Sequence, residues 1–417
     1  KNQTFLIPNY TWWGGPYYTL GLKAYDFLAG KLSLGRSKHV SKNETIRKLS
    51  TINRDNLKGS VSYQDGQFDD SRLAVNIAQT AIEKGGVLLN YFKVKNLTKN
   101  ADNKISGVVA IDQETQKEFT FKGKAIINAT GVFADDILQM DKPGAKRRIQ
   151  PSQGVHLVFD KSFLPGSDAI MIPKTDDGRV LFAVPWHDKV IVGTTDVMVD
   201  KHVAEPNATK DEVDFILETF NRFIEKKATR KDIKSIYAGL RPLAAPEDET
   251  GKTKEISRGH KILISDTGLI SITGGKWTTY RKMAEDTLSK AISLGYLPKK
   301  DCITEHLSIH GAMETTERDN HLYVYGTDQK HLQNLIDEDP ALGEKIHKDL
   351  DFLKVEVVWA ARHEMARTVE DVLARRVRVL FLDARKSIEM APQVAQILAR
   401  ELHKDKDWVN KQIEDYT

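Results

Sequence analysis

One segment constrains the fold of this 417-residue chain more than any other: LISITGGKWTTYR, at residues 269–281. An apolar run typical of a buried strand leads through two glycines directly into a helix, and glycines at such a junction let a ligand approach the backbone closely. The helix dipole and the free N–H groups of Trp277, Thr278 and Thr279 would attract a negative group, with help from Lys276. That group is a phosphate, a carboxylate or a ring that becomes anionic on reduction. An ordinary strand–turn–helix with a solvated lysine explains the segment equally well.

A second segment, AIINATGVFAD at residues 125–135, repeats this order. An apolar strand leads through Thr130 and Gly131 into a helix that starts near Phe133. Taken alone it indicates ligand contact only weakly, and a simple βα turn is the more economical interpretation.

Three polar side chains lie at places suited to chemistry. His156 alternates with apolar neighbours on a predicted strand, and its reference pKa of about 6.5 suits a general base. A core histidine with satisfied hydrogen bonds is the simpler alternative. Arg241 precedes a proline at a strand end, with Arg258 downstream in ISRGH. Either guanidinium could grip a phosphate with two hydrogen bonds, or form only a surface salt bridge.

Composition and missing motifs exclude several classes of protein. The net charge of +4, from 62 basic and 58 acidic residues, is too even to indicate nucleic-acid binding. The single cysteine, Cys302, excludes an intramolecular disulfide and a cysteine-based zinc site. No apolar run reaches the roughly 18 residues of a membrane span. The chain has no G-x-G-x-x-G, Walker A or G-x-S-x-G motif, and no further ligand supports a metal at His306 and His310.

The chain divides into zones of different pattern. Residues 1–145 mix helices with strands, including helices over 16–29 and after the capping residues Ser41 and Asp69, and a strand over Val87–Tyr91. The middle zone predicts a largely antiparallel sheet with one helix, opened by the capping box of Thr209 and Glu212, on one face. Its predicted strands are 154–159, 169–172, 179–184, 189–193 and 233–238.

Strand character returns over 262–272, and a helix follows from Lys276 to Leu294. Beyond residue 298 the pattern predicts helices, the strongest of them continuous from Lys354 to Arg376. Its apolar stripe is Val357, Val358, Ala361, Met365, Val369, Val372 and Leu373.

Together these segments resemble the FAD-dependent glycerol-3-phosphate dehydrogenase family, in the family's order and over nearly the whole chain. The resemblance is strongest in GGKWTTYRKMA at 274–284. The other matching motifs are YQDGQFDDSRL (63–73), NATGVFAD (128–135), PSQGVHLVFD (151–160), VGTTD (192–196), AGLRPLA (238–244) and EMARTVEDVLARR (364–376).

The resemblance implies a combined α/β and α+β fold. Residues 1–145 would be the remainder of a glutathione-reductase-like FAD-binding domain, together with segments of a substrate domain. Residues 146–261 would form the antiparallel substrate domain, residues 262–298 the last strand and helix of the FAD-binding domain, and residues 299–417 an all-helical C-terminal domain. Family members begin with a G-x-G-x-x-G unit that this sequence lacks, so we expect a truncated chain that binds FAD poorly by itself.

The implied reaction is oxidation of sn-glycerol 3-phosphate to dihydroxyacetone phosphate, with FAD as hydride acceptor and a membrane quinone receiving the electrons. His156 would be the catalytic base and Arg241 a catalytic and substrate-binding residue, joined at the substrate by Arg258 and Lys276. The residues implied in cofactor binding are Thr130, Gly131, Gly274, Gly275, Lys276, Trp277 and Thr278.

Alternatives remain open on the sequence alone. They are a glycerophosphate oxidase that uses O2, an FAD enzyme acting on an amino acid or amine, and a non-catalytic truncated relative. The family further implies a cytoplasmic protein bound peripherally to the inner face of the membrane. A second copy of the chain is a candidate partner, and nucleic acid is not.

Overall fold

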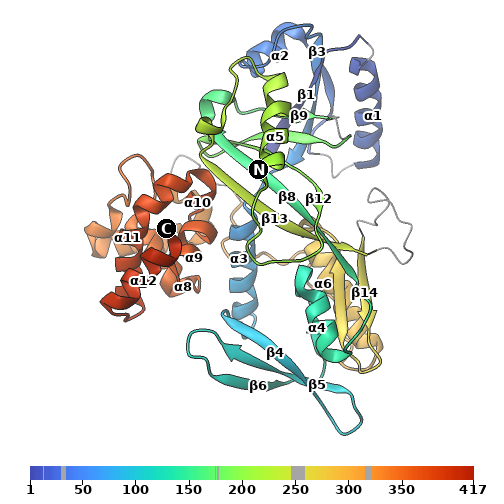
Figure 1. Cartoon of the computed structure of the whole chain (residues 1–417), viewed down its shortest axis with the longest axis vertical. Helices are drawn as coiled ribbons and strands as arrows, with labels where there is room; N and C mark the ends of the chain where they lie inside the picture. Colours follow the sequence, from blue (N-terminus) through green and yellow to red (C-terminus); the bar gives the residue numbers. More distant parts are fainter. Residues whose placement is uncertain (13, 30–33, 174, 176–177, 246–258, 315–320) are drawn as a thin grey trace.

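A nine-stranded sheet runs from the top of the molecule to its middle (Figure 1). The computed structural model describes residues 1–417 except 13, 30–33, 174, 176–177, 246–258 and 315–320. The strand order is β12-β8-β11-β10-β9-β1-β3-β2, with β13 also pairing with β8, and only β1 and β9 are parallel. The strands are β1 Asn2–Asn9, β2 Lys38–Ser41, β3 Gly59–Gly66, β8 Ile149–Asp160, β9 Ala169–Ile172, β10 Leu181–Trp186, β11 Lys189–Gly193, β12 Val197–Met198 and β13 Ser235–Ala244.

Helix α5, Lys210–Phe223, covers one face of this sheet and closes its core. Its apolar side buries Ile216 and Phe220 against the strands. The helix begins at the predicted capping box, where Thr209 and Glu212 bond each other's backbone N–H groups. The antiparallel sheet with one helix on its face is therefore confirmed. Two further helices of the first zone, α1 Gly14–Ala29 and α2 Lys42–Lys48, lie at the β2–β3 end (Figure 1).

A smaller sheet has the order β14-β15-β7, with β14 at His260–Ile264, β15 at Ile270–Gly274 and β7 at Ile127–Asn128. The predicted continuous strand over 262–272 is thus two antiparallel strands. A turn separates them because Gly268 has a φ of +91°, outside the extended range of a strand. Two helices follow this sheet, α4 Ala134–Asp141 and α6 Tyr280–Ser293.

A third sheet joins β4 Phe92–Lys99, β5 Ile105–Asp112 and β6 Glu118–Lys122. The predicted strand Val87–Tyr91 is wrong, because the strand begins one residue after it. Val87 is 87% exposed, and Tyr91 has a φ of +58° that turns the chain. The Tyr91 hydroxyl donates to the carboxylate of Asp371 at 2.7 Å.

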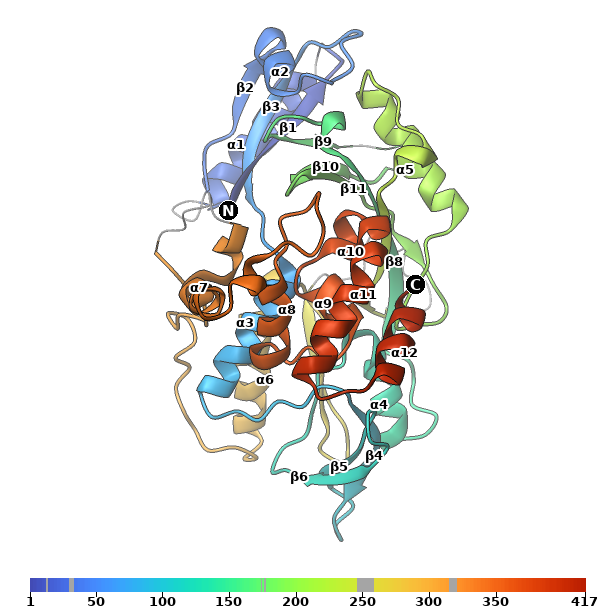
Figure 2. The same ribbon diagram turned by 90° about the vertical axis from the view of Figure 1, so that its left-hand side faces the viewer.

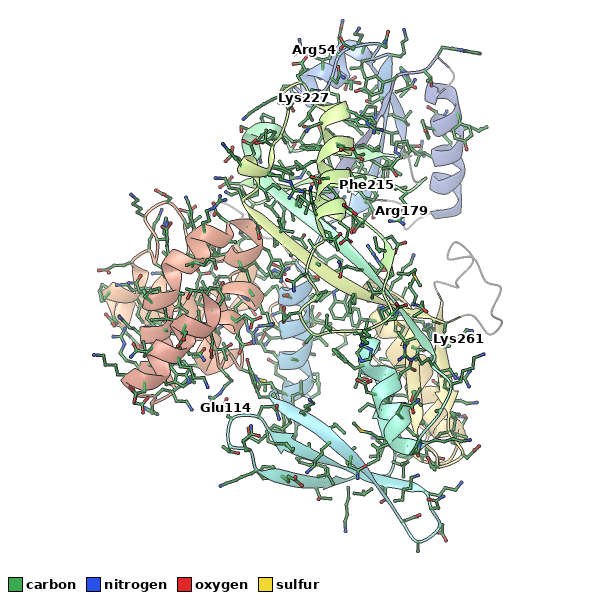
Figure 3. All side chains as sticks on the ribbon, in the orientation of Figure 1. Arg54, Glu114, Arg179, Phe215, Lys227 and Lys261 are labelled. Atoms are coloured by element: carbon green, nitrogen blue, oxygen red, sulfur yellow. The ribbon has the colours of Figure 1, made fainter. Side chains whose placement is uncertain are left out.

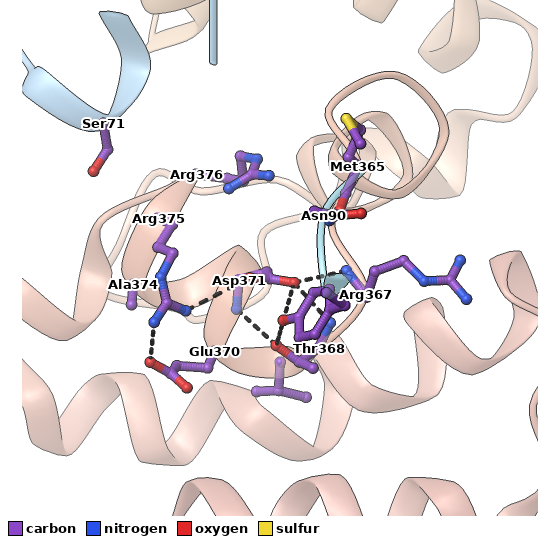
Figure 4. A network of polar contacts seen from close by, with 12 residues as sticks. Ser71, Asn90, Met365, Arg367, Thr368, Glu370, Asp371, Ala374, Arg375 and Arg376 are labelled. Atoms are coloured by element: carbon purple, nitrogen blue, oxygen red, sulfur yellow. Dashed lines mark hydrogen bonds and ion pairs between the residues drawn. The ribbon is translucent and has the colours of Figure 1, made fainter. Parts of the chain in front are cut away.

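Residues 299–314 form turns and irregular chain, so the prediction of helices from residue 298 onward is wrong for this stretch, whereas the described region after residue 320 is mostly helical, as expected. The predicted continuous helix from Lys354 to Arg376 is wrong, since it breaks into α8 and α9. Met365 has a φ of +57°, and Thr368 opens a new helix by capping the N–H of Asp371, while the Asp371 carboxylate accepts from the N–H of Thr368 (Figure 4). The helices are α7 Gln329–Glu338, α8 Lys354–His363, α9 Val369–Arg375, α10 Val379–Leu382, α11 Ala384–Glu401 and α12 Lys406–Tyr416.

Helix α3, Asp70–Glu83, ties the C-terminal helices to the sheets. It lies beside α8 in both views (Figures 1 and 2), and Arg72 of α3 forms a buried ion pair with Glu364. Glu114, on the turn between β5 and β6, lies toward the same helices and pairs with Arg367 at 2.5 Å (Figure 3). Of the helices in the described ranges, none combines the length and apolarity needed to cross a bilayer.

Candidate active site

The two glycine-containing turns lie side by side at one edge of the smaller sheet. Strands β7 and β15 are parallel neighbours, with Asn128 opposite Ser271, so their carboxyl ends meet at the same edge. The Asn128 amide reinforces this arrangement, because it donates to the hydroxyl of Ser271 at 3.1 Å and to the carbonyl of Ala134 at 3.0 Å. Ligands bind at such edges in open α/β sheets.

The double glycine is required by backbone geometry. Gly274 and Gly275 have φ values of +71° and +79°, which side chains disfavour. A Cβ on Gly274 would lie 2.8 Å from the carbonyl oxygen of Gly259, and one on Gly275 would lie 2.5 Å from the sulfur of Met283. The turn therefore places two residues without side chains at the edge of the sheet.

Replacing Gly274 by alanine is expected to destabilise the protein by more than the about 1–2 kcal/mol that a left-handed conformation alone costs. The added contact with the backbone carbonyl oxygen of Gly259, 2.8 Å from the new Cβ, accounts for the excess. The matched control is Gly295→Ala, at a φ of +77° with no atom within 4 Å of the new Cβ, which measures the conformational cost alone. Urea unfolding of both variants checks this, and equal losses would show that the close contact is harmless.

The chain after the double glycine begins as a 3₁₀ turn, Trp277–Thr279, and becomes α-helical only at Tyr280. The prediction that the N–H of Thr279 is free is wrong, because it donates to the carbonyl of Lys276 at 2.9 Å. In the described part of the chain the N–H groups of Trp277 and Thr278 have no acceptor. All four residues from Lys276 to Thr279 are exposed, so the turn is open rather than packed shut.

The second turn is arranged in a similar way. Thr130 donates its hydroxyl to the side-chain oxygen of Asn128 at 2.7 Å, which holds the start of the 3₁₀ turn Gly131–Phe133. Gly131 has a φ of +61°, and no atom lies within 4 Å of where its Cβ would be. This turn therefore also presents open backbone at the sheet edge.

His156 and Arg241 lie on one face of the β8–β13 ladder. Tyr237 pairs with His156, and Arg241 pairs with Ser152 four residues along. The guanidinium lies over Gly154, because a Cβ there would be 2.5 Å from one of its nitrogens. The absence of a side chain at Gly154 thus makes room for Arg241 beside His156. The structure confirms that these two candidates share one region.

Arg241 is held by the loop after β11. It donates to the hydroxyl of Thr194 at 3.2 Å and to the carbonyl of Thr195 at 3.3 Å, and forms an ion pair with Asp196 at 3.4 Å. The alternative that Arg241 forms only a surface salt bridge therefore accounts for its contact with Asp196 but not for its other hydrogen bonds. The strand also runs into the double-glycine turn, since the Cβ of Ala244 lies 3.7 Å from the position of a Cβ on Gly274.

Sequence reasoning missed the buried support beneath this loop. Glu212, only 5% exposed, accepts from the Thr195 hydroxyl at 2.8 Å and from the Gln153 amide at 2.8 Å. Thr195 in turn accepts from the N–H of Val155 at 2.9 Å. The sequence showed Glu212 only as a helix cap, and its burial against β8 arises from packing.

The imidazole of His156 is kept neutral by its surroundings. It stacks on the ring of Tyr237, with centroids 4.9 Å apart. Burial above all, and then the charge of Arg241, lower the pKa of His156 to about 4. No hydrogen bond reaches either ring nitrogen from the residues described, so the alternative of a satisfied core histidine does not apply. Arg258 lies outside the described residues.

Comparison with known proteins agrees with this arrangement. A family model described as FAD dependent oxidoreductase matches residues 15–281, and one described as the C-terminal domain of alpha-glycerophosphate oxidase matches residues 265–409. A solved structure of glycerol-3-phosphate dehydrogenase from Bacillus halodurans, complexed with FAD, superposes with a TM-score of 0.81 at 27% identity, over 100% of this chain and 80% of that one. The expected fold class is thereby confirmed.

Curated relatives point the same way. The mitochondrial glycerol-3-phosphate dehydrogenase of Schizosaccharomyces pombe is 34% identical over 95% of this chain and 70% of its own length. A probable mitochondrial enzyme of the same name from Caenorhabditis elegans is 35% identical over 95% of this chain and 58% of its own length. The described geometry, the two family models and these relatives together place the chain in the glycerol-3-phosphate dehydrogenase family of FAD-dependent oxidoreductases.

Proposed function

We propose that this chain oxidises sn-glycerol 3-phosphate to dihydroxyacetone phosphate, with FAD as the hydride acceptor. The observation that carries the proposal is the pairing of a neutral His156 with the cation Arg241 on one face of the β8–β13 ladder, beside the double-glycine turn. A base and a phosphate-binding cation are what a phosphorylated alcohol requires. The names of the relatives support the same substrate and cofactor.

The two turns fit a flavin cofactor. The open space beside Gly131 and the exposed turn that follows Gly274 and Gly275 can accept a planar ring, and the unpaired N–H groups of Trp277 and Thr278 can donate to it. When bound, FAD accepts the hydride and gains negative charge on its ring system. Donors fixed at a helix start stabilise charge that develops at such a position. Thr130 would hold the neighbouring turn, and the exposed cation of Lys276 adds to the positive field.

The substrate phosphate carries about −1.5 to −2 charges at neutral pH. We assign its binding to Arg241, assisted by Arg258 and Lys276. The secondary alcohol must also lose its hydroxyl proton, and His156 is the assigned acceptor. A phosphate beside Arg241 offsets the guanidinium charge that helps to keep the imidazole pKa low. Binding of the substrate therefore strengthens the base at the moment it is needed.

The proposal is tested by flavin spectroscopy. Because we expect the chain to hold FAD only weakly, the protein is equilibrated with a large excess of FAD, and the absorbance of the bound flavin near its visible maximum should bleach on addition of glycerol 3-phosphate under nitrogen. A flavin that binds but does not bleach would contradict the substrate assignment. Failure to bind flavin at all would favour the non-catalytic alternative.

Replacing Arg241 by alanine should raise KM for glycerol 3-phosphate about 10- to 100-fold, since hydrogen bonds to a charged group contribute about 1.5–3 kcal/mol. The matched control is Arg230→Ala, which removes an exposed guanidinium that forms an ion pair with Asp214 of α5 at 2.5 Å. Steady-state kinetics check both. An unchanged KM in the Arg241 variant would remove this residue from the phosphate site.

We also propose a membrane quinone as electron acceptor, a peripheral location on the inner face of the membrane, and a second copy of the chain as a partner. The relatives are named dehydrogenases rather than oxidases, which favours an acceptor other than O2, and the quinone itself is what the family resemblance implies. The solved L-alpha-glycerophosphate oxidase of Mycoplasma pneumoniae, at 19% identity and a TM-score of 0.53, shares the fold alone. Peroxide yield measured against reduction of a quinone analogue separates the two acceptors.

A further inference from the structure

Helix α10 of the C-terminal region docks directly on the strand that carries Tyr237 and Arg241. The Ser235 hydroxyl of β13 donates to the carbonyl of Leu380 at 2.6 Å, and the N–H of Ala384 donates to the carbonyl of Lys234 at 3.1 Å. These two bonds lie on either side of Phe381. The helix is therefore fixed in register with the strand, although about 145 residues separate them in sequence.

A chain of aromatic rings runs from α10 to the candidate base. Phe381 meets Tyr237 edge to face, with centroids 4.8 Å apart and planes at 81°. Tyr237 lies nearly parallel to the imidazole of His156, at 4.9 Å and 14°. Each contact restricts the ring that follows, because packed aromatic pairs favour such geometries over others.

Arg378 anchors the outer end of this chain. Its guanidinium lies 4.4 Å from the centroid of Phe381 and forms an ion pair with Asp70 at 3.1 Å. It also donates to the hydroxyl of Ser71 at 2.5 Å and lies 3.6 Å from the carboxylate of Asp69. The start of α3 thus holds the arginine that covers Phe381.

We propose that the C-terminal helical region positions the catalytic base: Phe381, held by Arg378, fixes the Tyr237 ring against His156 and shields the imidazole from water. The inference rests on the proposed function, in which His156 accepts the substrate proton. Tyr237, Phe381 and Arg378 are positioning residues, since they act through His156. The C-terminal helical region would then contribute to the active site and would not be a functionally separate domain.

The charged groups that act on these rings are Arg241, Asp70 and Arg378. Arg241 lowers the pKa of His156, and the carboxylate of Asp70 opposes it more weakly, while burial has the largest effect. Burial also raises the pKa of Tyr237, with Arg378 acting in the opposite direction. Tyr237 is therefore a neutral ring at every pH used below. Removing it should admit water to the imidazole and raise the pKa of His156 from about 4 toward its usual value of about 6.5.

The experiment follows the titration of His156 by NMR in protein carrying isotope-labelled histidine, with the signal assigned through His156→Gln. The midpoint should move upward by one to two pH units in both Tyr237→Ala and Phe381→Ala. Tyr237→Phe keeps the ring and should restore the low midpoint. The matched control is Tyr10→Leu, which removes a tyrosine that follows β1 and packs edge to face on Phe223 of α5, and it should leave the midpoint unchanged.

Activity provides the second readout. At pH 5.5 a midpoint raised by one to two pH units should lower the fraction of neutral imidazole in Tyr237→Ala by about 1.3- to 4-fold, lowering kcat there to the same extent while KM stays near that of the parent protein. If Phe381→Ala does not fold, Phe381→Leu tests the same contact with a smaller change. An unchanged midpoint in folded Tyr237 and Phe381 variants overturns the inference. A shifted midpoint without any effect on turnover would instead contradict the role of His156 as base.

Discussion

Replacing His156 by glutamine should lower the rate of flavin reduction by glycerol 3-phosphate about 100- to 10,000-fold, the usual contribution of a positioned general base. Glutamine retains a polar side chain but takes up no proton in this pH range. The phosphate contacts of Arg241 remain, so KM should change much less than kcat. Stopped-flow measurement of flavin bleaching under single-turnover conditions isolates the chemical step.

The matched control for this substitution is His347→Gln. His347 pairs with Glu389 at 2.9 Å in the C-terminal region, and no proposed role falls on it. Its loss should leave flavin reduction at the parent rate. A His156 variant that keeps a rate within threefold of the parent would mean that another group accepts the proton.

The second large effect should come from Glu364→Gln, which we expect to lower the free energy of unfolding by about 3–5 kcal/mol. The Glu364 side chain is 1% exposed and pairs with Arg72, whose guanidinium also lies 4.5 Å from the centroid of the Tyr325 ring. Arg376 approaches the same carboxylate at 3.6 Å. Neutralising Glu364 leaves two guanidinium groups without their counter-charge where little water can reach them.

Urea unfolding followed by circular dichroism measures this loss. The control is Glu118→Gln, whose pairing with Lys95 lies on the surface, with both side chains about half exposed, and should contribute less than about 1 kcal/mol. A comparable loss in both variants would show that burial of the Glu364 pair adds nothing. Since this pair joins α3 to the C-terminal helices, its loss should also weaken the anchorage of Arg378 to Asp70.

Much of the local structure was predictable from short motifs. The capping residues Ser41, Asp69 and Thr209 each begin a helix as expected, because a cap acts within one turn of chain. The double glycine at 274–275 was predictable for a similar reason, since its positive φ values are a local property. The strands of the middle zone followed from alternation and turn residues, with boundaries that shifted by a few residues.

Two local predictions failed where a distant partner changed the outcome. The apolar stripe continues through Met365, yet the chain breaks there, with the carboxylate of Glu364 buried against Arg72 and Thr368 capping a new helix. The predicted strand Val87–Tyr91 does not form, and the hydroxyl of Tyr91 bonds instead to Asp371, 280 residues further along the chain. Neither partner can be identified from periodicity.

The sequence by itself determined where helices begin, where glycine is needed in a turn, and which family's motifs the chain carries. Each of these features depends on neighbours within a few residues of the chain. Only the tertiary structure decided which side chains meet. It placed Arg241 over Gly154 beside His156, and Phe381 against Tyr237. Such contacts depend on how separate elements pack, and packing energies are summed over the whole core rather than encoded in any one segment.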